Sequence, residues 1–395
     1  MSPGAPPRTN TSINGSDPFK KRWAYAAGIA IGMASGWNIA NVGAVAEPLA
    51  HDYDISLATI GLFTTALFVV HLASQVPAGR AADRFGARRV ALAALVVLVV
   101  ANAFASISPN PALALAARAL CGVGTGFGFV AGSDYVRASG GSPLVQGLFG
   151  GASVAAPGVA LAVIPQLHGP LGFRAPFLTA IVISFAVLGL LALAPEAPAA
   201  TRRAVGERSP SVARDKRLYR FGVLHAATFG LSVVIGNWIV TLLVKHGHGH
   251  AAAGAVGSLT LLLGMITRPL GGWLLRRRPE QARAMLAASL VAGAAGTAVL
   301  ALPAPFPLLV LASAVVGLAA GMPFAAAFGG AAATRPDAPG AAVGFVNAWS
   351  ALAILAGTPL LGLSFSLPGE GRTGFAVVAV LWAAALAALP HRLPA

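Results

Sequence analysis

The chain has 395 residues, of which 56% are hydrophobic and only 10% are charged, and its formal net charge is +15. So few charged residues cannot hydrate the surface of a soluble fold, and most of the chain must face lipid or other apolar helices. The basic residues lie between apolar stretches and do not gather on a polar domain, which argues against nucleic-acid binding. The single cysteine, Cys121, excludes an internal disulfide framework and a multi-cysteine metal site.

Residues 1–21 are predicted to form a disordered tail, because the first 19 residues are rich in Pro, Ser, Thr, Asn and Gly. Lys20, Lys21 and Arg22 lead into a long apolar run that has no clear cleavage site. The first helix is therefore predicted to be an uncleaved membrane span.

Twelve stretches of the chain meet the requirement for a membrane-spanning helix, which needs about 20 mainly apolar residues. The first six are 22–46, 55–79, 88–107, 111–135, 144–167 and 173–194. After the polar residues 195–218, the other six are 219–245, 251–275, 282–302, 306–330, 339–367 and 372–390. We therefore expect an all-α membrane protein with twelve transmembrane helices in two pseudo-symmetric six-helix bundles, 22–194 and 219–390.

The positions of Lys and Arg predict the orientation, because cytoplasmic loops carry the excess of these residues. Of the 27 Lys and Arg residues, only three fall in loops that would lie outside, namely Arg174, Lys245 and Arg372. We expect a multi-pass protein of the cell inner membrane with both termini in the cytoplasm, including a short tail at 391–395. The cytoplasmic linker 195–218 contains the basic segment 201–217, which is expected to anchor this topology next to anionic lipid.

Short motifs recur at matching places in the two predicted halves. Residues 36–38 (Gly-Trp-Asn) match 236–238 (Gly-Asn-Trp), and 77–79 (Pro-Ala-Gly) match 269–271 (Pro-Leu-Gly). Internal repeats of this kind are typical of carriers whose substrate site lies at the membrane midplane between the halves.

Two longer motifs carry a family resemblance. Residues 79–89, Gly-Arg-Ala-Ala-Asp-Arg-Phe-Gly-Ala-Arg-Arg, resemble the signature between the second and third helices of the major facilitator superfamily. Residues 118–126, Arg-Ala-Leu-Cys-Gly-Val-Gly-Thr-Gly, are similar to the second motif of that superfamily, with its buried arginine and glycine run. The resemblance extends from about residue 22 to 390 and implies a secondary carrier without a cofactor.

Two further segments distantly resemble nitrate/nitrite porters and cyanate-type permeases. They are 267–273 (Thr-Arg-Pro-Leu-Gly-Gly-Trp) and 147–151 (Gly-Leu-Phe-Gly-Gly). Those porters usually carry an arginine in the second helix where this chain has Gln75, and their Gly-Asn signature in the fifth helix is missing. The resemblance therefore does not imply nitrate as the substrate.

Arg118 and Arg268 lie deep within predicted spans, whereas the carboxylates nearest to spans, Glu47 and Asp134, lie at span ends. The interior is thus net positive, and arginine offers paired donors to a carboxylate or an oxyanion. An ionisable residue in hydrocarbon usually faces a cavity or a partner. The alternatives are that Arg118 braces the fourth span against the first and that Arg268 extends to the cytoplasmic interface.

The space beside Arg268 and a polar face of the second span suggest a substrate path. Gly257, Thr260, Gly264 and Arg268 follow helical spacing, as do Thr64, Phe68, His71 and Gln75. Such a face either lines a cavity or makes hydrogen bonds between helices. His71 is the first candidate for a proton-responsive group and His225 the second, because imidazole titrates near neutral pH.

Amide and indole side chains can orient a small polar ligand in an otherwise apolar pocket. Asn38 and Asn41 lie in the first span, Asn237 and Trp238 in the seventh, and Asn347 in the eleventh. Each can instead serve helix packing. The predicted substrate-binding residues are therefore Arg268, Gln75, His71, Asn38, Asn41, Asn237, Trp238, Arg118 and Asn347.

Asp83 and Arg84 are expected to form a cytoplasmic charge network with Asp134, through pairing of Asp134 with the arginines of residues 79–89. The predicted gating residues are Gly79, Asp83, Arg84 and Asp134. His246, His248 and His250 alternate in an outer loop and could converge on one transition metal, but a polar turn is the preferred interpretation, and no metal site is predicted.

The leading hypothesis is alternating-access transport of a small anion or polar anionic metabolite across the cytoplasmic membrane. The expected partners are this substrate, the lipid bilayer and a coupling proton, and the chain is expected to act as a monomer. The alternative is proton-coupled export of drugs or amphipathic secondary metabolites, which often uses a carboxylate in the first span. An enzyme is not expected, since no metal motif, nucleophile elbow or pair of buried carboxylates is present.

Overall fold

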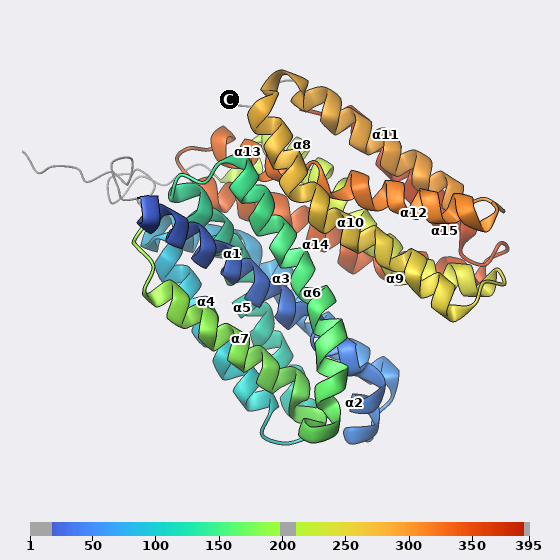
Figure 1. The fold of residues 1–395 in the computed structure, drawn as a ribbon, viewed down its shortest axis with the longest axis horizontal. Coiled ribbons are helices and arrows are strands. Elements are labelled where there is room, and N and C mark those ends of the chain that lie inside the picture. Colours follow the sequence, from blue (N-terminus) through green and yellow to red (C-terminus); the bar gives the residue numbers. More distant parts are fainter. Residues whose placement is uncertain (1–17, 198–210, 391–395) are drawn as a thin grey trace, which may run out of the picture.

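The computed structural model describes residues 18–197 and 211–390, and these residues form helices joined by short connections (Figure 1). The predicted N-terminal tail up to residue 17, most of the predicted linker and the predicted tail 391–395 lie outside the described residues. The side chains of Glu47 and His250 lie outside them as well.

The helices of the first predicted half are α1 Pro18–Ala40, α2 Ala46–Asp52, α3 Leu57–Phe85, α4 Ala87–Ala105, α5 Pro111–Ala138, α6 Pro143–Leu171 and α7 Ala175–Ala192. Those of the second are α8 Lys216–His225, the π-helix η5 Ala226–Gly230, α9 Leu231–Lys245, α10 His250–Arg277, α11 Ala282–Leu300, α12 Phe306–Gly321, α13 Phe324–Thr334, α14 Pro339–Leu363, α15 Arg372–Ala384 and the 3-10 helix η8 Ala385–Ala388.

Local sequence explains where several helices begin. The side chains of Ser56, Asn110 and Asp215 accept hydrogen bonds from backbone N–H groups in the first turns of α3, α5 and α8. Proline stands in the first turn of α5, α6 and α14, where its missing N–H costs no helical hydrogen bond.

Each predicted span coincides with one helix or with consecutive helices. Within the described residues, nine helical segments are long and apolar enough to cross a membrane, and Arg372–Ala388 is a shorter apolar segment. The predicted all-α membrane fold is confirmed. The residue boundaries of the two halves stay a prediction.

The segment 79–89 is more helical than the predicted spans suggested. Helix α3 continues to Phe85, and α4 begins at Ala87, so that only Gly86 separates them. Gly86 has φ of +90°, a conformation that favours glycine, and its N–H donates to the carbonyl of Ala82. The arginines of this segment therefore lie on two helix ends joined by a tight turn.

The most extensive contacts between the halves are those of α3 with α14 and of α6 with α10, and α6 with α13 and α5 with α14 make smaller ones. In Figure 1 the two groups of helices come together near the start of α1 and near α13, and they separate toward α2 on one side and toward α9 and α15 on the other. We call the end that carries the arginines of 80–89 and 276–278 the basic end, and the opposite end the far end.

Glycines allow backbone contact between the halves near the basic end. A Cβ atom on Gly79 would overlap the carbonyl of Gly340, and one on Gly344 would overlap that of Gln75. On the other pair of helices, Gly147 meets the carbonyl of Arg268 and Gly272 meets that of Pro143 in the same way. Small residues permit such close packing of helices in lipid.

A pair of glycine substitutions tests this contact. We expect Gly344→Ala to lower the midpoint of thermal unfolding in detergent, because overpacking costs about 1–3 kcal/mol. Gly329→Ala is the matched control, since no atom lies within 4 Å of the Cβ it adds. Alanine is also the better helix former, so the control should unfold at the same temperature or higher. Equal destabilisation of the two variants would contradict the close contact.

Candidate functional site

Arg268 lies at the contact between α10 and α6 and is only 2% exposed. Its NH1 group donates to the carbonyl of Gly150, 2.7 Å away in the opposite half. Its guanidinium carbon lies 4.5 Å from the ring centroids of both Phe229 and Phe324. Among the described residues, no carboxylate forms an ion pair with Arg268. The side chain therefore crosses between the halves and does not extend to an interface with water.

A narrow cavity lies beside Arg268, on the side toward the far end. The residues that line it include Thr260 and Gly264, from the predicted small-residue face, and Ser232 of α9. The volume is about 10 Å³, close to the room that one water molecule needs. In this conformation the hydroxyl of Thr260 donates to the carbonyl of Gly257 on its own helix, and the hydroxyl of Ser232 donates to the carbonyl of Phe229 in the preceding π-helix. The site is thus nearly closed and must widen to admit a larger ligand.

A chain of polar side chains crosses the other contact between the halves. The Nδ2 group of Asn347 on α14 donates to Oε1 of Gln75 on α3, 2.8 Å away. Asn347 Oδ1 lies 3.3 Å from Nε2 of His225 on α8. On the α3 side, Gln75 donates to the backbone carbonyl of His71, and His71 Nδ1 lies 3.0 Å from the hydroxyl of Thr125. The structure therefore brings the predicted residues Gln75, His71 and Asn347 together.

Aromatic rings connect this polar chain to Arg268. The imidazole of His225 lies 5.5 Å from Phe229, 5.9 Å from Phe324 and 5.0 Å from Phe328, measured between ring centroids. These phenylalanines were not among the predicted site residues. Their signal was helical spacing, because Phe229 follows His225 by four residues and Phe328 follows Phe324 by four.

A second cavity, of about 260 Å³, lies near the basic end between the halves. Its lining includes Ser133 and Gln146 from the first half, and Phe328 and Gly329 from the second. The rings of Phe324 and Phe328 stack with centroids 4.5 Å apart. Because Phe324 contacts Arg268 and Phe328 lines the second cavity, this stacked pair connects Arg268 to the wall of the second cavity.

Arg118, Asn38 and Asn41 lie inside the first half, away from this site. The NH1 group of Arg118 donates to the carbonyl of Asn38 at 2.9 Å and to Oδ1 of Asn41 at 3.0 Å. Asn102 donates to Oδ1 of Asn38, and Asn38 donates to Ser184. These bonds join α1 to α4, α5 and α7, which is the bracing arrangement given as the alternative for Arg118.

Asn237 and Trp238 lie on α9 and contact α14 through a single residue. Asn237 donates to the hydroxyl of Thr358 at 3.1 Å, and the indole of Trp238 donates to the carbonyl of Thr358 at 2.7 Å. Asn237 is exposed. The two residues do not contact Arg268 or the Gln75–Asn347 pair in this conformation.

Asp83 binds the start of α14 across the contact between the halves. Its carboxylate accepts hydrogen bonds from the N–H groups of Gly340 and Ala341, at 2.8 and 2.9 Å. A carboxylate at a helix N-terminus is stabilised by the unpaired N–H groups and by the helix dipole. Gly79 lies one turn away, against Gly340. Two predicted gating residues therefore lie at the contact between the halves near the basic end.

The predicted pairing of Asp134 with the arginines of 79–89 is not found. Asp134 forms its ion pair with Arg137, 2.7 Å away, three residues further along the same helix. Arg84 is exposed, and its guanidinium lies 5.1 Å from the ring centroid of Phe85. Residues at i and i+3 are neighbours on the surface of one helix, so Arg137 is within reach of Asp134 without any contact from another helix.

The histidines of the far-end loop do not form a metal site within the described part of the chain. His246 Nδ1 lies 2.7 Å from the carbonyl of Leu242, and His248 packs against Phe306. No group of three or more potential metal ligands occurs among the described residues. The side chain of His250 is outside them, so the three-histidine site stays an open alternative.

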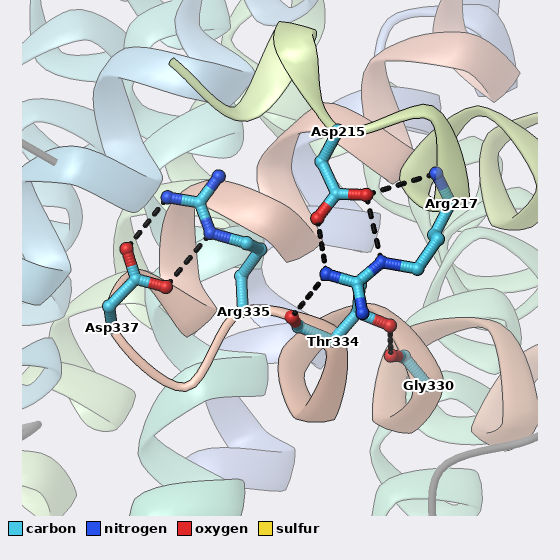
Figure 2. A network of polar contacts seen from close by, with 6 residues as sticks. All are labelled: Asp215, Arg217, Gly330, Thr334, Arg335 and Asp337. Carbon is cyan, nitrogen blue, oxygen red and sulfur yellow. Dashed lines mark hydrogen bonds and ion pairs between the residues drawn. The ribbon is translucent and has the colours of Figure 1, made fainter. Parts of the chain in front are cut away.

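A second charged group lies at the basic end (Figure 2). Asp215 caps α8 and accepts two hydrogen bonds from the Arg217 guanidinium, at 2.7 and 3.0 Å. Arg217 also donates to the carbonyl of Thr334, the last residue of α13, while Arg335 pairs with Asp337. The network joins the start of α8 to the connection between α13 and α14. The hydrogen bonds from Arg217 lower the pKa of the Asp215 carboxyl below its ordinary value.

The carboxylate of Asp83 can be tested by cysteine labelling. We expect Asp83→Asn to weaken the closed basic end, because a hydrogen bond to a charged group contributes roughly 1.5 kcal/mol or more. With Ser133→Cys as the reporter in the second cavity, labelling by a membrane-impermeant maleimide should rise about tenfold. Background is low because Cys121 is buried. Glu196→Gln is the control, since its ion pair with Arg88 lies within the first half; an equal rise there would contradict the gating role.

The lowered pKa of Asp215 predicts a pH-dependent stability. A carboxylate with a lower pKa in the folded state stabilises that state above its unfolded pKa, and the effect is lost as pH falls through the folded pKa. Asp215→Asn keeps the helix cap but removes the charge. We expect the free energy of unfolding at pH 7 to fall by less than about 1 kcal/mol, because Arg217 is exposed, and this difference from wild type to shrink as the pH is lowered below the ordinary Asp pKa of 3.8. The exposed Glu280→Gln should show no such pH dependence.

Comparison with known proteins places this geometry in a family. The sequence matches the family described as Major Facilitator Superfamily over residues 27–358. No curated protein matches it. Among similar solved structures, the E. coli fucose:proton symporter FucP has a TM-score of 0.71 at 16% identity, covering 93% of this chain and 98% of that chain.

Two further structures have the same fold. The proton:xylose symporter XylE has a TM-score of 0.75 at 13% identity, covering 93% of this chain and 95% of that one. The human organic anion transporter MFSD10 has a TM-score of 0.73 at 16% identity, covering 95% and 100%. At these identities the likeness establishes the fold alone. Because the family match spans most of the sequence, the chain belongs to the major facilitator superfamily and is a multi-pass membrane transporter, not an enzyme.

Proposed function

We propose that the protein is a secondary active transporter that moves a small anion or polar anionic metabolite across the cytoplasmic membrane by alternating access. The observation that carries this proposal is Arg268, a guanidinium buried between the halves that has no carboxylate partner among the described residues. A buried charge is costly in hydrocarbon, and such residues mark substrate and ion pathways. A substrate that brings negative charge would offset this cost.

The surroundings of Arg268 stabilise its charge only in part. The rings of Phe229 and Phe324 provide cation–π attraction, and Gly150 accepts one hydrogen bond, but none of them carries a negative charge. Arginine has five N–H donors in a planar fork, so donors remain for a carboxylate or an oxyanion. The hydroxyl groups of Ser232 and Thr260 line the same cavity and can rotate to donate to a ligand.

The contacts between the halves suggest how binding drives the conformational change. The bond from Arg268 to Gly150 joins the two halves, and an anion that binds the guanidinium competes with this carbonyl. A ligand shifts a conformational equilibrium only when it binds the two states differently. Because an anion would bind better once the narrow cavity widens, its binding favours separation of α10 from α6.

The orientation is part of the proposal. Loops rich in Arg and Lys stay in the cytoplasm, so the basic end, with both termini, is cytoplasmic in a cell inner membrane. The described conformation is then closed toward the cytoplasm by Asp83, the glycine contacts and the Phe324–Phe328 pair. We propose Arg268, Gln75, His71 and Asn347 as residues of the substrate path, with Asn237 and Trp238 nearer its outer part. Arg118, Asn38 and Asn41 stabilise the first half, and the protein acts as a monomer.

The substrate class rests on Arg268 and not on the fold. The similar structures are named for fucose, xylose and organic anions, so one fold serves neutral and charged substrates. The exporter alternative would draw support from a carboxylate in the path. Among the described residues, those that line the cavity beside Arg268 or form hydrogen bonds with the Gln75–Asn347 pair include no carboxylate. The ionisable residues among them are Arg268 and the histidines.

Uptake into proteoliposomes tests the proposal. The panel contains benzoate, succinate, nitrate and sulfate, with glucose and choline as neutral and cationic comparisons. We expect saturable uptake of at least one anion and a loss of about tenfold or more in Arg268→Gln, because one charged hydrogen bond contributes roughly 1.5–3 kcal/mol. Arg268→Lys should retain part of the activity, since it keeps the charge but not the planar donors.

Arg283→Gln is the matched control, because Arg283 is exposed at the basic end. Equal anion uptake by wild type and Arg268→Gln would rule out Arg268 as the charge partner. Proton flux that is stimulated by ethidium, without uptake of any anion, would instead establish the exporter alternative.

A further inference from the structure

His225 occupies an irregular place in its helix. It is the last residue of α8, it is 1% exposed, and the π-helix η5 begins at the next residue. A π-helical turn inserts an extra residue into the helix and is found frequently at functional sites. Here it positions Phe229, whose ring contacts both His225 and Arg268.

The hydrogen-bond network determines the tautomer of His225. Because Asn347 donates its Nδ2 group to Gln75, its Oδ1 atom is the group that faces His225. An amide oxygen only accepts, so Nε2 of His225 carries the hydrogen and donates. The other nitrogen, Nδ1, then holds a lone pair, and it is buried without a hydrogen-bond partner. A buried acceptor without a partner is unfavourable and is rare in folded proteins.

The charge nearest to His225 is that of Arg268. Both groups contact the rings of Phe229 and Phe324, at 4.5 Å for the guanidinium carbon and at 5.5 and 5.9 Å for the imidazole centroid. Because both groups contact the same ring of Phe229, the distance between them is at most the sum of their two distances to that ring. Two positive charges at such a separation repel each other in a low-dielectric interior.

Other groups around His225 do not offset this repulsion. The polar groups that face it are Asn347 and, through it, Gln75 and His71. Apart from His225, the ionisable residues on α8 and on the elements that pack against α8 and η5 lie at or toward the ends of these elements: Arg214, Asp215, Lys216, Arg217, Tyr219, Arg220, Lys245, Arg283, Arg335 and Arg372. Asp337 and Glu370 are likewise in connections at the two ends.

We propose that Nδ1 of His225 is the binding site of the coupling proton, and that this proton and an anion on Arg268 bind cooperatively. This inference rests on the proposed anion transport. The proton adds to the Nδ1 lone pair and converts imidazole to imidazolium, and it is released as a proton on the other side of the membrane together with the anion. The anion neutralises Arg268, and the repulsion that opposes the second positive charge is removed.

His71 fits the proton site less well than His225. Its Nδ1 atom already lies 3.0 Å from the hydroxyl of Thr125, and its nearest ring is Phe68 of its own helix. It does not contact Arg268 or the rings beside it. A bound anion on Arg268 would therefore favour protonation of His225 through a shared set of aromatic contacts, and His71 has no such contacts.

The proton site can be tested without transport. In nanodiscs, ¹⁵N-histidine NMR reports which ring nitrogen carries hydrogen and the pH at which each histidine is protonated. We expect the Nε2–H tautomer for His225 at neutral pH. In Arg268→Gln, or in wild type with benzoate, His225 should become protonated at a pH about one unit higher, which corresponds to one removed charge at an effective dielectric of roughly 20. An unchanged midpoint in Arg268→Gln would overturn the proposal, whether or not anions are transported.

Transport gives the second test. His225→Gln keeps an amide that can donate to Asn347 but cannot bind a proton at neutral pH. With the anion that shows Arg268-dependent uptake, proteoliposomes of His225→Gln should take it up without the internal acidification seen in wild type. His51→Gln, at an exposed far-end position, is the control and should retain acidification. Loss of acidification in His71→Gln with retention in His225→Gln would assign the proton to His71 instead.

Discussion

A permanent positive charge held between the two halves is the constraint on which the rest of the structure depends. Arginine does not lose its proton under ordinary conditions, so Arg268 stays charged in an apolar contact. The described residues supply two aromatic rings and one carbonyl, which attract the guanidinium but leave its charge unbalanced. A buried positive charge of this kind repels cations, and this is the physical basis of the proposed preference for an anion.

The two contacts between the halves have the same construction. Each combines glycines, which bring two backbones together, with one charged group that binds the backbone of the opposite half. On α3 and α14 the charged group is Asp83, and on α6 and α10 it is Arg268. Backbone contacts resist small shifts, whereas single hydrogen bonds can be exchanged for bonds to a ligand or to water. The charged groups are therefore the points at which the closed state can be released.

The sequence predicted the spans and part of the site, but not the contacts across it. Apolar runs and basic loops were sufficient for the helices, since both follow from the cost of charge in lipid. Arg268, Gln75 and Asn347 stood out as polar residues within spans. Their partners did not, because Gly150, Phe229 and Phe324 are ordinary residues of apolar helices. The π-helix after His225 and the extension of α3 to Phe85 depend on tertiary packing, which periodicity cannot reveal.

The break between α12 and α13 explains how the two cavities can be joined. Helix α12 ends at Gly321, and Pro323 precedes α13, so the regular helical hydrogen bonds are interrupted there. Both rings of the stacked pair, Phe324 and Phe328, lie on α13. A movement of α13 about the break would carry the rings away from Arg268 together, and it would open a way to the basic-end cavity while the glycine contacts of α3 and α6 stay in place. Such a movement would need less rearrangement than full separation of the halves.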